Sequence, residues 1–277
     1  MSRPKLPLFW RFIAFLAVAF ARVLLRWRID VRGLEHVPRE GGAVIAFNHH
    51  SYFDFVMTAW AIVLELRRPV RFLAKREIWQ SPWVGWIVRF AGAVPVDRTS
   101  SDSRHRAFDA AIDALRDGEL VAVAPEQTIS KSFRLLPFRT GAARMAQAAD
   151  VPIVPAVGWG TQRFATKGRR PRIVRKIPVM IEYGEPIRVP PDTEPVAATR
   201  ELQDQMQAML DRSQRDYPDR PRPGEEWWQP AHLGGTAPTH EEVLAEHLAR
   251  ERRWDRDGGQ SDVSEAEGRR SPPEGER

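Results

Sequence analysis

Residues 43–54 read Ala-Val-Ile-Ala-Phe-Asn-His-His-Ser-Tyr-Phe-Asp, an apolar run followed by a cluster of polar side chains. A continuous apolar run of five residues is typical of a strand that is buried on both faces. From Phe53 to about Leu66 the pattern becomes helical, so the polar cluster occupies a strand-to-helix connection. Reactive side chains of α/β proteins commonly project from such connections.

The alternation of strand and helix patterns continues along the chain. Strands are predicted at 43–47, 70–74, 93–96, 120–124, 151–157 and 179–183, and helices at 53–66, 78–90, 104–117, 141–149 and 197–213. Strands that alternate with helices indicate a largely parallel sheet covered by helices. We therefore expect an α/β fold with a mixed, mostly parallel sheet flanked by helices.

The composition excludes several classes of protein. The 277 residues are 43% hydrophobic and 28% charged, which is globular composition and argues against a protein that crosses the membrane many times. The chain has no cysteine, so disulfides, thiolate metal sites and a cysteine nucleophile are excluded. Its chemistry must use oxygen, nitrogen or carboxylate groups.

The first 32 residues combine positive charge with apolar and aromatic side chains. They carry seven Lys or Arg residues and one acid, Asp30. The uncharged run 12–21 is about ten residues long, whereas a spanning helix needs about 20. We expect a helix that lies in the membrane interface, with its arginines reaching toward anionic headgroups. A cleaved signal peptide and a first core helix are the alternatives.

These patterns divide the chain into four parts. Residues 1–32 are the membrane-interfacial segment, and residues 33–213 carry the strand and helix alternation. Residues 214–257 are a C-terminal extension, in which Thr239 and Glu242 have the spacing of a capping box. Residues 258–277 have no apolar face and are predicted to be disordered.

The polar cluster contains a candidate base and a group to orient it. A tight turn can bring His49, after the strand, against Asp54, at the start of the next helix. The carboxylate would fix the imidazole tautomer and support the imidazolium that forms when the ring takes a proton. In the alternative interpretation, Asp54 only complements the helix N-terminus and the histidines are turn residues.

Polar groups also follow two other predicted strands. Asp97 and Arg98 follow residues 93–96, and Pro-Glu-Gln-Thr at 125–128 follows residues 120–124. Ligands bind at the carboxyl ends of strands in open α/β sheets, so these groups converge on one edge. Arg98 could bind a phosphate bidentately, and Lys75 could add a positive charge.

Four blocks of the sequence, in order, resemble the glycerolipid acyltransferases of the 1-acyl-sn-glycerol-3-phosphate acyltransferase type. They are His49-x-x-x-x-Asp54, Gly-Ala-Val-Pro-Val-Asp-Arg at 92–98, Pro-Glu-Gln-Thr-Ile-Ser at 125–130 and Val-Pro-Ile-Val-Pro at 151–155. The resemblance covers roughly residues 30–190 and implies the glycerolipid acyltransferase fold.

The resemblance implies the reaction and the roles of the residues. His49, oriented by Asp54, would remove the proton of the free hydroxyl of 1-acyl-sn-glycerol-3-phosphate. That hydroxyl would attack the thioester of acyl-CoA or acyl carrier protein and give phosphatidic acid. The residues implied in substrate binding are Lys75, Arg98, Glu126, Gln127 and Thr128. The resemblance implies neither a metal nor a cofactor, and it places the protein on membrane lipids at the cytoplasmic face of the cell membrane, as a peripheral or monotopic protein.

The third block departs from the family pattern Pro-Glu-Gly-Thr-Arg-Ser at two positions. Gln127 replaces the glycine, and Ile129 replaces an arginine that is counted among the phosphate-binding groups. Lys131, Arg134 or Arg139 could supply the missing charge from the same loop. Another lysolipid or a glycolipid is the alternative acceptor.

Two further features bear on membranes. Residues 162–176 contain seven cations and no acid, which favours contact with anionic lipid or with the phosphates of CoA over a solvated hairpin, and nucleic acid is not expected. Tryptophans at 79, 83 and 86 suggest that the predicted helix 78–90 dips into the membrane, lines an acyl tunnel or packs in the core.

Two rival functions come from other classes. One is a membrane-binding protein without catalysis, against which the intact pair of His49 and Asp54 argues. The other is a His/Asp metallohydrolase, which is disfavoured because the remaining histidines are scattered along the chain.

Overall fold

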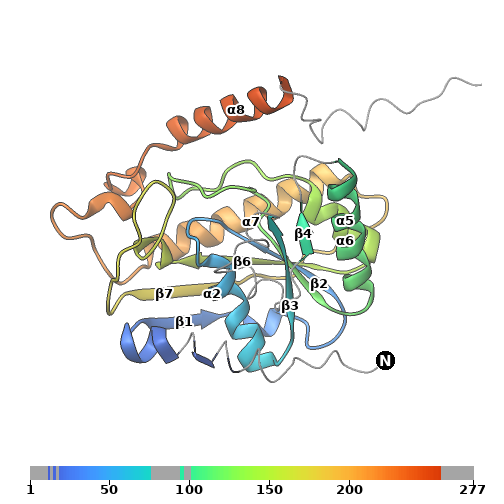
Figure 1. The fold of residues 1–277 in the computed structure, drawn as a ribbon, viewed down its shortest axis with the longest axis horizontal. Coiled ribbons are helices and arrows are strands. Elements are labelled where there is room, and N and C mark those ends of the chain that lie inside the picture. Colours follow the sequence, from blue (N-terminus) through green and yellow to red (C-terminus); the bar gives the residue numbers. More distant parts are fainter. Residues whose placement is uncertain (1–11, 13–14, 17–18, 76–93, 97–100, 257–277) are drawn as a thin grey trace, which may run out of the picture.

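The computed structural model describes residues 12, 15–16, 19–75, 94–96 and 101–256 (Figure 1). These residues form a seven-stranded sheet with the order β1-β7-β6-β2-β5-β3-β4. The strands are β1 Arg28–Arg32, β2 Ala43–Phe47, β3 Val70–Lys75, β4 Val94–Val96, β5 Leu120–Val123, β6 Ile153–Trp159 and β7 Pro178–Tyr183. Neighbouring strands are parallel except for β6 and β7, which are antiparallel. The mixed, mostly parallel sheet predicted from the sequence is confirmed.

The central strand β2 shows why its sequence is apolar without interruption. All five of its residues are buried. Val44 and Ala46 belong to the core on one face of the sheet, whereas Ala43, Ile45 and Phe47 belong to the core on the other. A strand that is covered on both faces has no position for a polar side chain. The reactive residues therefore begin only where the strand ends.

Helices cover both faces of the sheet. The α-helices are α2 Asp54–Ala61, α5 Ser101–Arg116, α6 Gly141–Ala149, α7 Pro195–Arg215 and α8 His240–Arg256. Side chains of α5, α6 and α7 share one core cluster, whereas α2 packs in the other cluster with the N-terminal residues of the described chain. The predicted helix 78–90 lies outside the described residues.

The sheet begins earlier than the sequence analysis expected. Strand β1 pairs in parallel with β7, although its residues were assigned to the segment before residue 33. Arg28, Asp30 and Arg32 are exposed, and the residues between them are half-buried. Alternating charges are usual on an edge strand, and here they concealed the strand among the basic residues of the N-terminal segment.

The N-terminal residues that the structure describes have a buried side and an exposed side. Ala21, Leu25 and Trp27 are buried in the same core cluster as α2. Six large apolar side chains are exposed: Phe12, Phe15, Leu16, Phe20, Val23 and Leu24. Among the described residues, no helix combines the length and apolar character needed to cross a membrane.

The C-terminal extension packs against the domain. Tyr217, Trp228 and Ala237 are buried in the core cluster that contains α7. The predicted capping box is confirmed, because Thr239 and Glu242 exchange two hydrogen bonds, of 2.9 and 3.3 Å. Helix α8 then runs along the outside of the molecule (Figure 1). The predicted disordered tail lies outside the described residues.

Candidate active site

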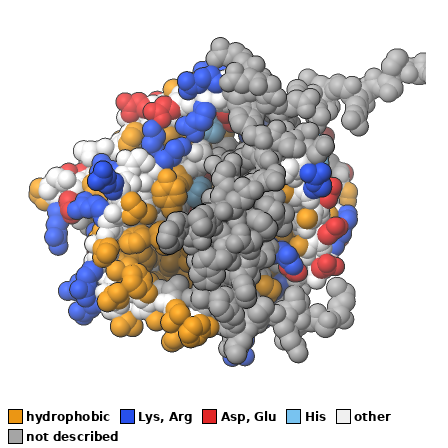
Figure 2. Space-filling model, in the orientation of Figure 1, with side chains coloured by type: hydrophobic (Ala, Val, Ile, Leu, Met, Phe, Trp, Pro, Cys, Tyr) orange, Lys and Arg blue, Asp and Glu red, His pale blue; other side chains and the backbone are white. Residues whose placement is uncertain are grey.

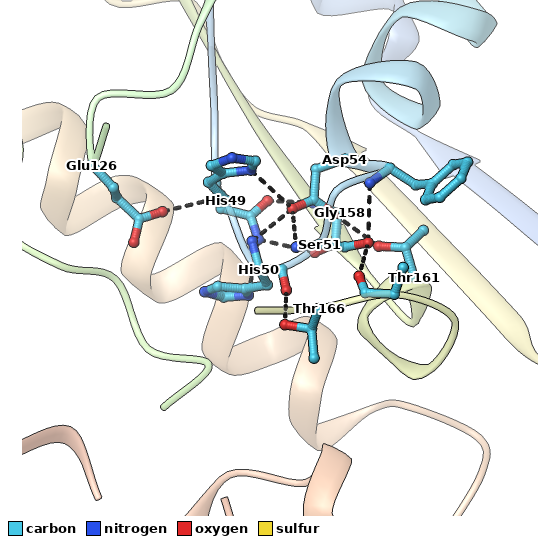
Figure 3. Close-up of polar contacts among 11 residues, drawn as sticks. His49, His50, Ser51, Asp54, Glu126, Gly158, Thr161 and Thr166 are labelled. Carbon is cyan, nitrogen blue, oxygen red and sulfur yellow. Dashed lines mark hydrogen bonds and ion pairs between the residues drawn. The ribbon is translucent and has the colours of Figure 1, made fainter. Parts of the chain in front are cut away.

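Asp54 anchors the turn between β2 and α2. Its Oδ2 accepts the backbone N–H groups of His50 and Ser51, each at 2.6 Å, and its Oδ1 accepts a hydrogen bond from the hydroxyl of Thr161 at 2.8 Å. The carboxylate is also the acidic group in the first turn of α2, where the positive end of the helix dipole favours it. The side chain of Asp54 is buried and fully held in place (Figure 3).

The imidazole of His49 lies against this carboxylate. Its Nδ1 is 3.6 Å from Asp54 Oδ2, close enough for an ion pair and longer than a hydrogen bond. The His49 side chain is 24% exposed, whereas that of Asp54 is 1% exposed. With Nδ1 toward the carboxylate, Nε2 lies on the opposite side of the ring. This is the arrangement of a base whose far nitrogen takes a proton while the near one is oriented by an acid.

The backbone of His49 is held by the loop of the third block. Its N–H donates to Glu126 Oε1 at 2.8 Å, and its carbonyl accepts the N–H of Ser130 at 2.9 Å. The other oxygen of Glu126 accepts the N–H of Leu136 at 2.9 Å. Burial raises the pKa of Glu126 to about 8, against the opposing effect of these two N–H donors. Glu126 therefore positions His49 through the backbone, a role that sequence reasoning did not assign to it.

His50 packs inside the protein. Its ring is buried between Phe133 and Trp159, with ring centroids 6.0 Å apart in each pair. Its Nδ1 is 3.1 Å from the amide nitrogen of Asn48. Burial lowers the pKa of His50 to about 4, with the charge of Asp54 opposing the shift and that of His49 adding to it. His50 is therefore neutral near pH 7.

Asn48 joins the turn to β6. Its side-chain amide donates to the carbonyl of Gly158 at 3.0 Å and accepts the N–H of Gly158 at 2.7 Å. The two bonds continue the sheet pairing beyond the end of β2. No pattern in the sequence predicts this role, because Gly158 lies 110 residues after Asn48 and its neighbourhood has only a strand pattern.

A third segment, residues 161–167, closes around the turn. The hydroxyl of Thr166 donates to the carbonyl of His50 at 2.7 Å, and that of Ser51 donates to the carbonyl of Ala165 at 2.7 Å. Lys167 then reaches the third-block loop, where its Nζ is 3.0 Å from Thr128 Oγ1. Sequence reasoning noticed only the charges of this segment and missed its hydroxyl groups.

The structure accounts for the two unusual residues of the third-block loop, residues 125–130, in different ways. Gln127 has a φ of 55°, in the left-handed region that favours glycine, so the glycine usual at this position has a conformational reason. Ile129 is buried, with 6% of its surface exposed, so it is part of the packing of the loop.

The other predicted site residues are described only in part. Lys75 ends β3, and its side chain lies outside the described residues, as does all of Arg98. Of the seven cations predicted to face lipid or CoA, three contact the C-terminal extension: Arg163 pairs with Asp219, Arg169 stacks on Trp227, and Arg172 pairs with Glu225. In the part of the chain that the structure describes, no cluster of three or more His, Asp or Glu side chains could hold a metal ion.

Known proteins resemble this chain in sequence. Residues 28–159 match the family model "Acyltransferase". The chain is 30% identical over 161 residues to a chloroplastic 1-acyl-sn-glycerol-3-phosphate acyltransferase of Brassica napus, which covers 57% of this chain and 45% of that protein. It is also 30% identical over 136 residues to the 1-acyl-sn-glycerol-3-phosphate acyltransferase of Bacillus subtilis, which covers 49% of this chain and 65% of that protein.

A solved structure shares the fold. The 1-acyl-sn-glycerophosphate acyltransferase PlsC of Thermotoga maritima superposes with a TM-score of 0.61 at 23% identity, over 76% of this chain and 80% of that one. The match to the B. napus protein spans less than half of that relative's length. Residues 28–159 of this chain are therefore similar to the acyltransferase family.

Proposed function

We propose that this protein is an O-acyltransferase that converts 1-acyl-sn-glycerol-3-phosphate to phosphatidic acid, with acyl-CoA or acyl carrier protein as the thioester donor. The observation that carries the proposal is the juxtaposition of His49 and Asp54 at the end of β2, within a domain similar to this family. The named activity of the relatives supports the choice of acceptor.

In the proposed reaction the two side chains have different roles. Nε2 of His49 takes the proton of the acceptor hydroxyl as its oxygen attacks the thioester carbonyl carbon. The new C–O bond forms, and the tetrahedral intermediate then collapses by breaking the C–S bond. The imidazolium returns the proton to the thiolate, so the products are the diacyl lipid and a free thiol. Asp54 stabilises the imidazolium through Nδ1, 3.6 Å away.

The backbone contacts of His49 contribute positioning. Glu126 and Ser130 hold its N–H and carbonyl groups, and Asp54 is itself held by three donors. The backbone of His49 and the carboxylate beside its ring are therefore held before substrate arrives, which reduces the entropic cost of reaching the reactive arrangement. In this proposal Lys75, Arg98, Gln127 and Thr128 bind the acceptor at the same edge of the sheet.

The test is acyl transfer from acyl-CoA to lysophosphatidic acid in lipid vesicles. We expect His49→Ala to lower kcat by about 10²–10⁴-fold, because it removes the general base. His105→Ala, which truncates an exposed histidine of α5, should retain the activity of the wild type. Equal turnover by the wild type and a correctly folded His49→Ala variant would overturn the assignment of the base.

A second candidate acceptor has its own motivation in the structure. Ile129 is buried where the family pattern has an arginine, so the loop carries no charge at that position. Another lysolipid or a glycolipid would use the same base. A panel of acceptors with and without a phosphate monoester separates the two assignments: the proposal requires the phosphate-bearing acceptor to have the highest kcat/KM.

We further propose that the protein works as a peripheral protein at the cytoplasmic face of the membrane. The N-terminal residues expose a series of apolar side chains, and they lie beside the basic segment, since the N–H of Lys176 donates to the carbonyl of Leu25 at 2.8 Å. Ile173 of that segment is 78% exposed. Figure 2 shows hydrophobic side chains gathered on the face that carries α2, with Lys and Arg at the margin.

Membrane association is tested by sedimentation with vesicles. Each cation near an anionic surface contributes about 1 kcal/mol, so binding should increase with the fraction of anionic lipid and decrease with salt. Ile173→Asp should weaken it, because a charge replaces an inserted apolar side chain. Binding that is indifferent to this substitution and to lipid charge would contradict the proposed surface.

A further inference from the structure

The third-block loop lacks a cation where its family pattern has one, and the cations that follow it in the chain are each paired with an acid of a C-terminal helix. Ile129 is buried in the packing of the loop. Arg134 pairs with Asp211 of α7 at 3.8 Å, and Arg139 pairs with Glu251 of α8. These arginines, two of the three residues expected to supply the charge, are therefore each paired with an acid of a C-terminal helix.

Lys167 reaches the same loop from another part of the chain. Its Nζ lies 3.0 Å from Thr128 Oγ1. Thr128 stands between Glu126 and Ser130, which bond the two backbone groups of His49. Thr166, the residue before Lys167, donates to the carbonyl of His50. Lys167 thus connects two segments that hold the turn between β2 and α2: its own segment, which bonds to His50, and the third-block loop, which bonds to His49.

Lys131, the residue after the third block, provides a second ammonium group. Its Nζ pairs with Glu246 Oε2 of α8 at 2.6 Å. Its side chain runs past Gly168, where a Cβ atom would lie 3.9 Å from Lys131 Cδ. The pKa of Glu246 is lowered, first by the hydrogen bond and charge of Lys131 and also by the charge of Lys167. One carboxylate of α8 is therefore within the field of both lysines.

We propose that Lys167 and Lys131 bind the phosphate group of the acceptor, in place of the arginine that the third block lacks, and that Glu246 competes with this phosphate for them. The inference rests on the proposed function and deepens it. A phosphate dianion carries one more negative charge than a carboxylate, so two ammonium groups complement it better than one carboxylate complements them.

The competing ion pair is weak enough to be displaced. The side chains of Lys131 and Glu246 are 29% and 54% exposed, and exposed ion pairs of this kind contribute about 0–1 kcal/mol. A phosphate dianion carries more negative charge than the carboxylate of Glu246, so it competes effectively for the ammonium group of Lys131.

The test compares Lys167→Met, Lys131→Met and Glu246→Gln with the wild type, using lysophosphatidic acid and its phosphate-free counterpart, monoacylglycerol. Each lysine variant should raise the KM for lysophosphatidic acid about tenfold, the change that corresponds to about 1.4 kcal/mol. The effect should be largest for the phosphate-bearing acceptor, so the KM for acyl-CoA and for monoacylglycerol should change much less. Glu246→Gln should lower the KM for lysophosphatidic acid.

Two further variants serve as controls. Arg200→Met removes an exposed cation of α7 and controls for loss of charge, and Lys167→Arg should restore binding.

The outcomes separate this inference from the proposed function. If Lys167→Met leaves the KM for lysophosphatidic acid unchanged while His49→Ala is inactive, the lysine site is wrong and the reaction stands. If the lysine variants raise the KM for acyl-CoA instead, the phosphate belongs to the donor and the acceptor site is overturned. Calorimetric binding of lysophosphatidic acid without donor gives a readout that needs no turnover. Equal affinity in the wild type and Lys167→Met would overturn the inference even if the protein transferred acyl groups to another acceptor.

Discussion

His50 in the turn and Glu126 in the third-block loop are buried ionisable residues whose contributions to stability depend on pH in opposite ways. His50, with a pKa lowered to about 4 from 6.5, remains neutral in the folded state while the unfolded chain takes a proton. Its contribution to stability is therefore lost as pH falls below 6.5 toward 4. Glu126, with a pKa raised to about 8 from 4.5, is favoured in its protonated form, so its contribution is lost as pH rises from 4.5 toward 8.

The pH ranges over which His50 and Glu126 change stability overlap. The variant His50→Asn is therefore needed to measure the effect of His50 alone. The asparagine oxygen can accept from Asn48 as the imidazole Nδ1 does. Between pH 6.5 and 5 the wild type should lose about 2 kcal/mol of unfolding free energy relative to this variant, at about 1.4 kcal/mol per pH unit. Urea unfolding at several pH values measures the difference. Parallel curves for the two proteins would show that His50 does not titrate as described.

Gln127 tests the backbone requirement of the third block. Gln127→Gly relieves a left-handed conformation that costs about 1 kcal/mol, but it adds flexibility to the unfolded chain of about the same value, so its stability should stay near that of the wild type. Gln127→Val places a β-branched side chain in this conformation and should lose more than about 1 kcal/mol. Urea unfolding of both variants decides, and equal losses would contradict the conformational explanation.

The sequence predicted the candidate catalytic pair but not what surrounds it. His49 and Asp54 are five residues apart, so one turn brings them together whatever the rest of the chain does. Gly158 and Thr161 lie more than a hundred residues after the residues to which they bond. Lys167, the third partner, comes from an irregular segment. Hydroxyl groups and single lysines in irregular segments have no periodicity that would identify their partners.

Among the elements, those with a strong hydrophobic pattern were predicted well. Strand β2 and helix α6 have the bounds expected from the sequence, and α5 begins three residues before its predicted start. Strand β1 was missed because it has no apolar run. It is a strand because it pairs with β7 at the edge of the sheet. Strand β6 begins after Pro152 and extends to Trp159, two residues beyond its predicted end.

Helix α8 offers a prediction at the scale of one element. Thr239→Ala removes the side chain that caps the N–H of Glu242, and the loss of such a cap costs about 1 kcal/mol. We expect faster amide hydrogen exchange in the first turns of α8, while α7 keeps its protection as an internal reference. Unchanged exchange in α8 would mean that its contacts with the domain, such as that of Lys131 with Glu246, determine its stability instead of the cap.

At the scale of the molecule, the C-terminal extension is a structural part of the domain. Asp219 pairs with Arg28 of β1 and with Arg163, whose guanidinium lies 4.4 Å from the ring centre of Trp228. The hydroxyl of Tyr217 donates to the carbonyl of Pro178 at the start of β7. The extension therefore joins the edge of the sheet to the segment that closes over the catalytic turn.

Trp228→Ala tests this arrangement. The side chain is 4% exposed, and truncation of a buried tryptophan costs about 3–5 kcal/mol. Trp227→Ala is the matched control, since Trp227 is only half-buried and stacks on exposed Arg169; it should lose much less. Chemical unfolding measures both variants. A similar small loss for each would show that the extension is only loosely attached.

Strand β1 also has a consequence for how the protein is made. Its partner is β7, where Arg28 lies opposite Pro178, so β1 leaves the ribosome long before the residues that complete its pairing. At about 5–20 residues per second the wait is on the order of ten seconds. We expect protease to cut stalled nascent chains near residues 20–32 when synthesis stops before β7, and to spare them once β7 has emerged. During that wait the aromatic side chains of the first segment can contact a bilayer before the domain to which they belong has folded.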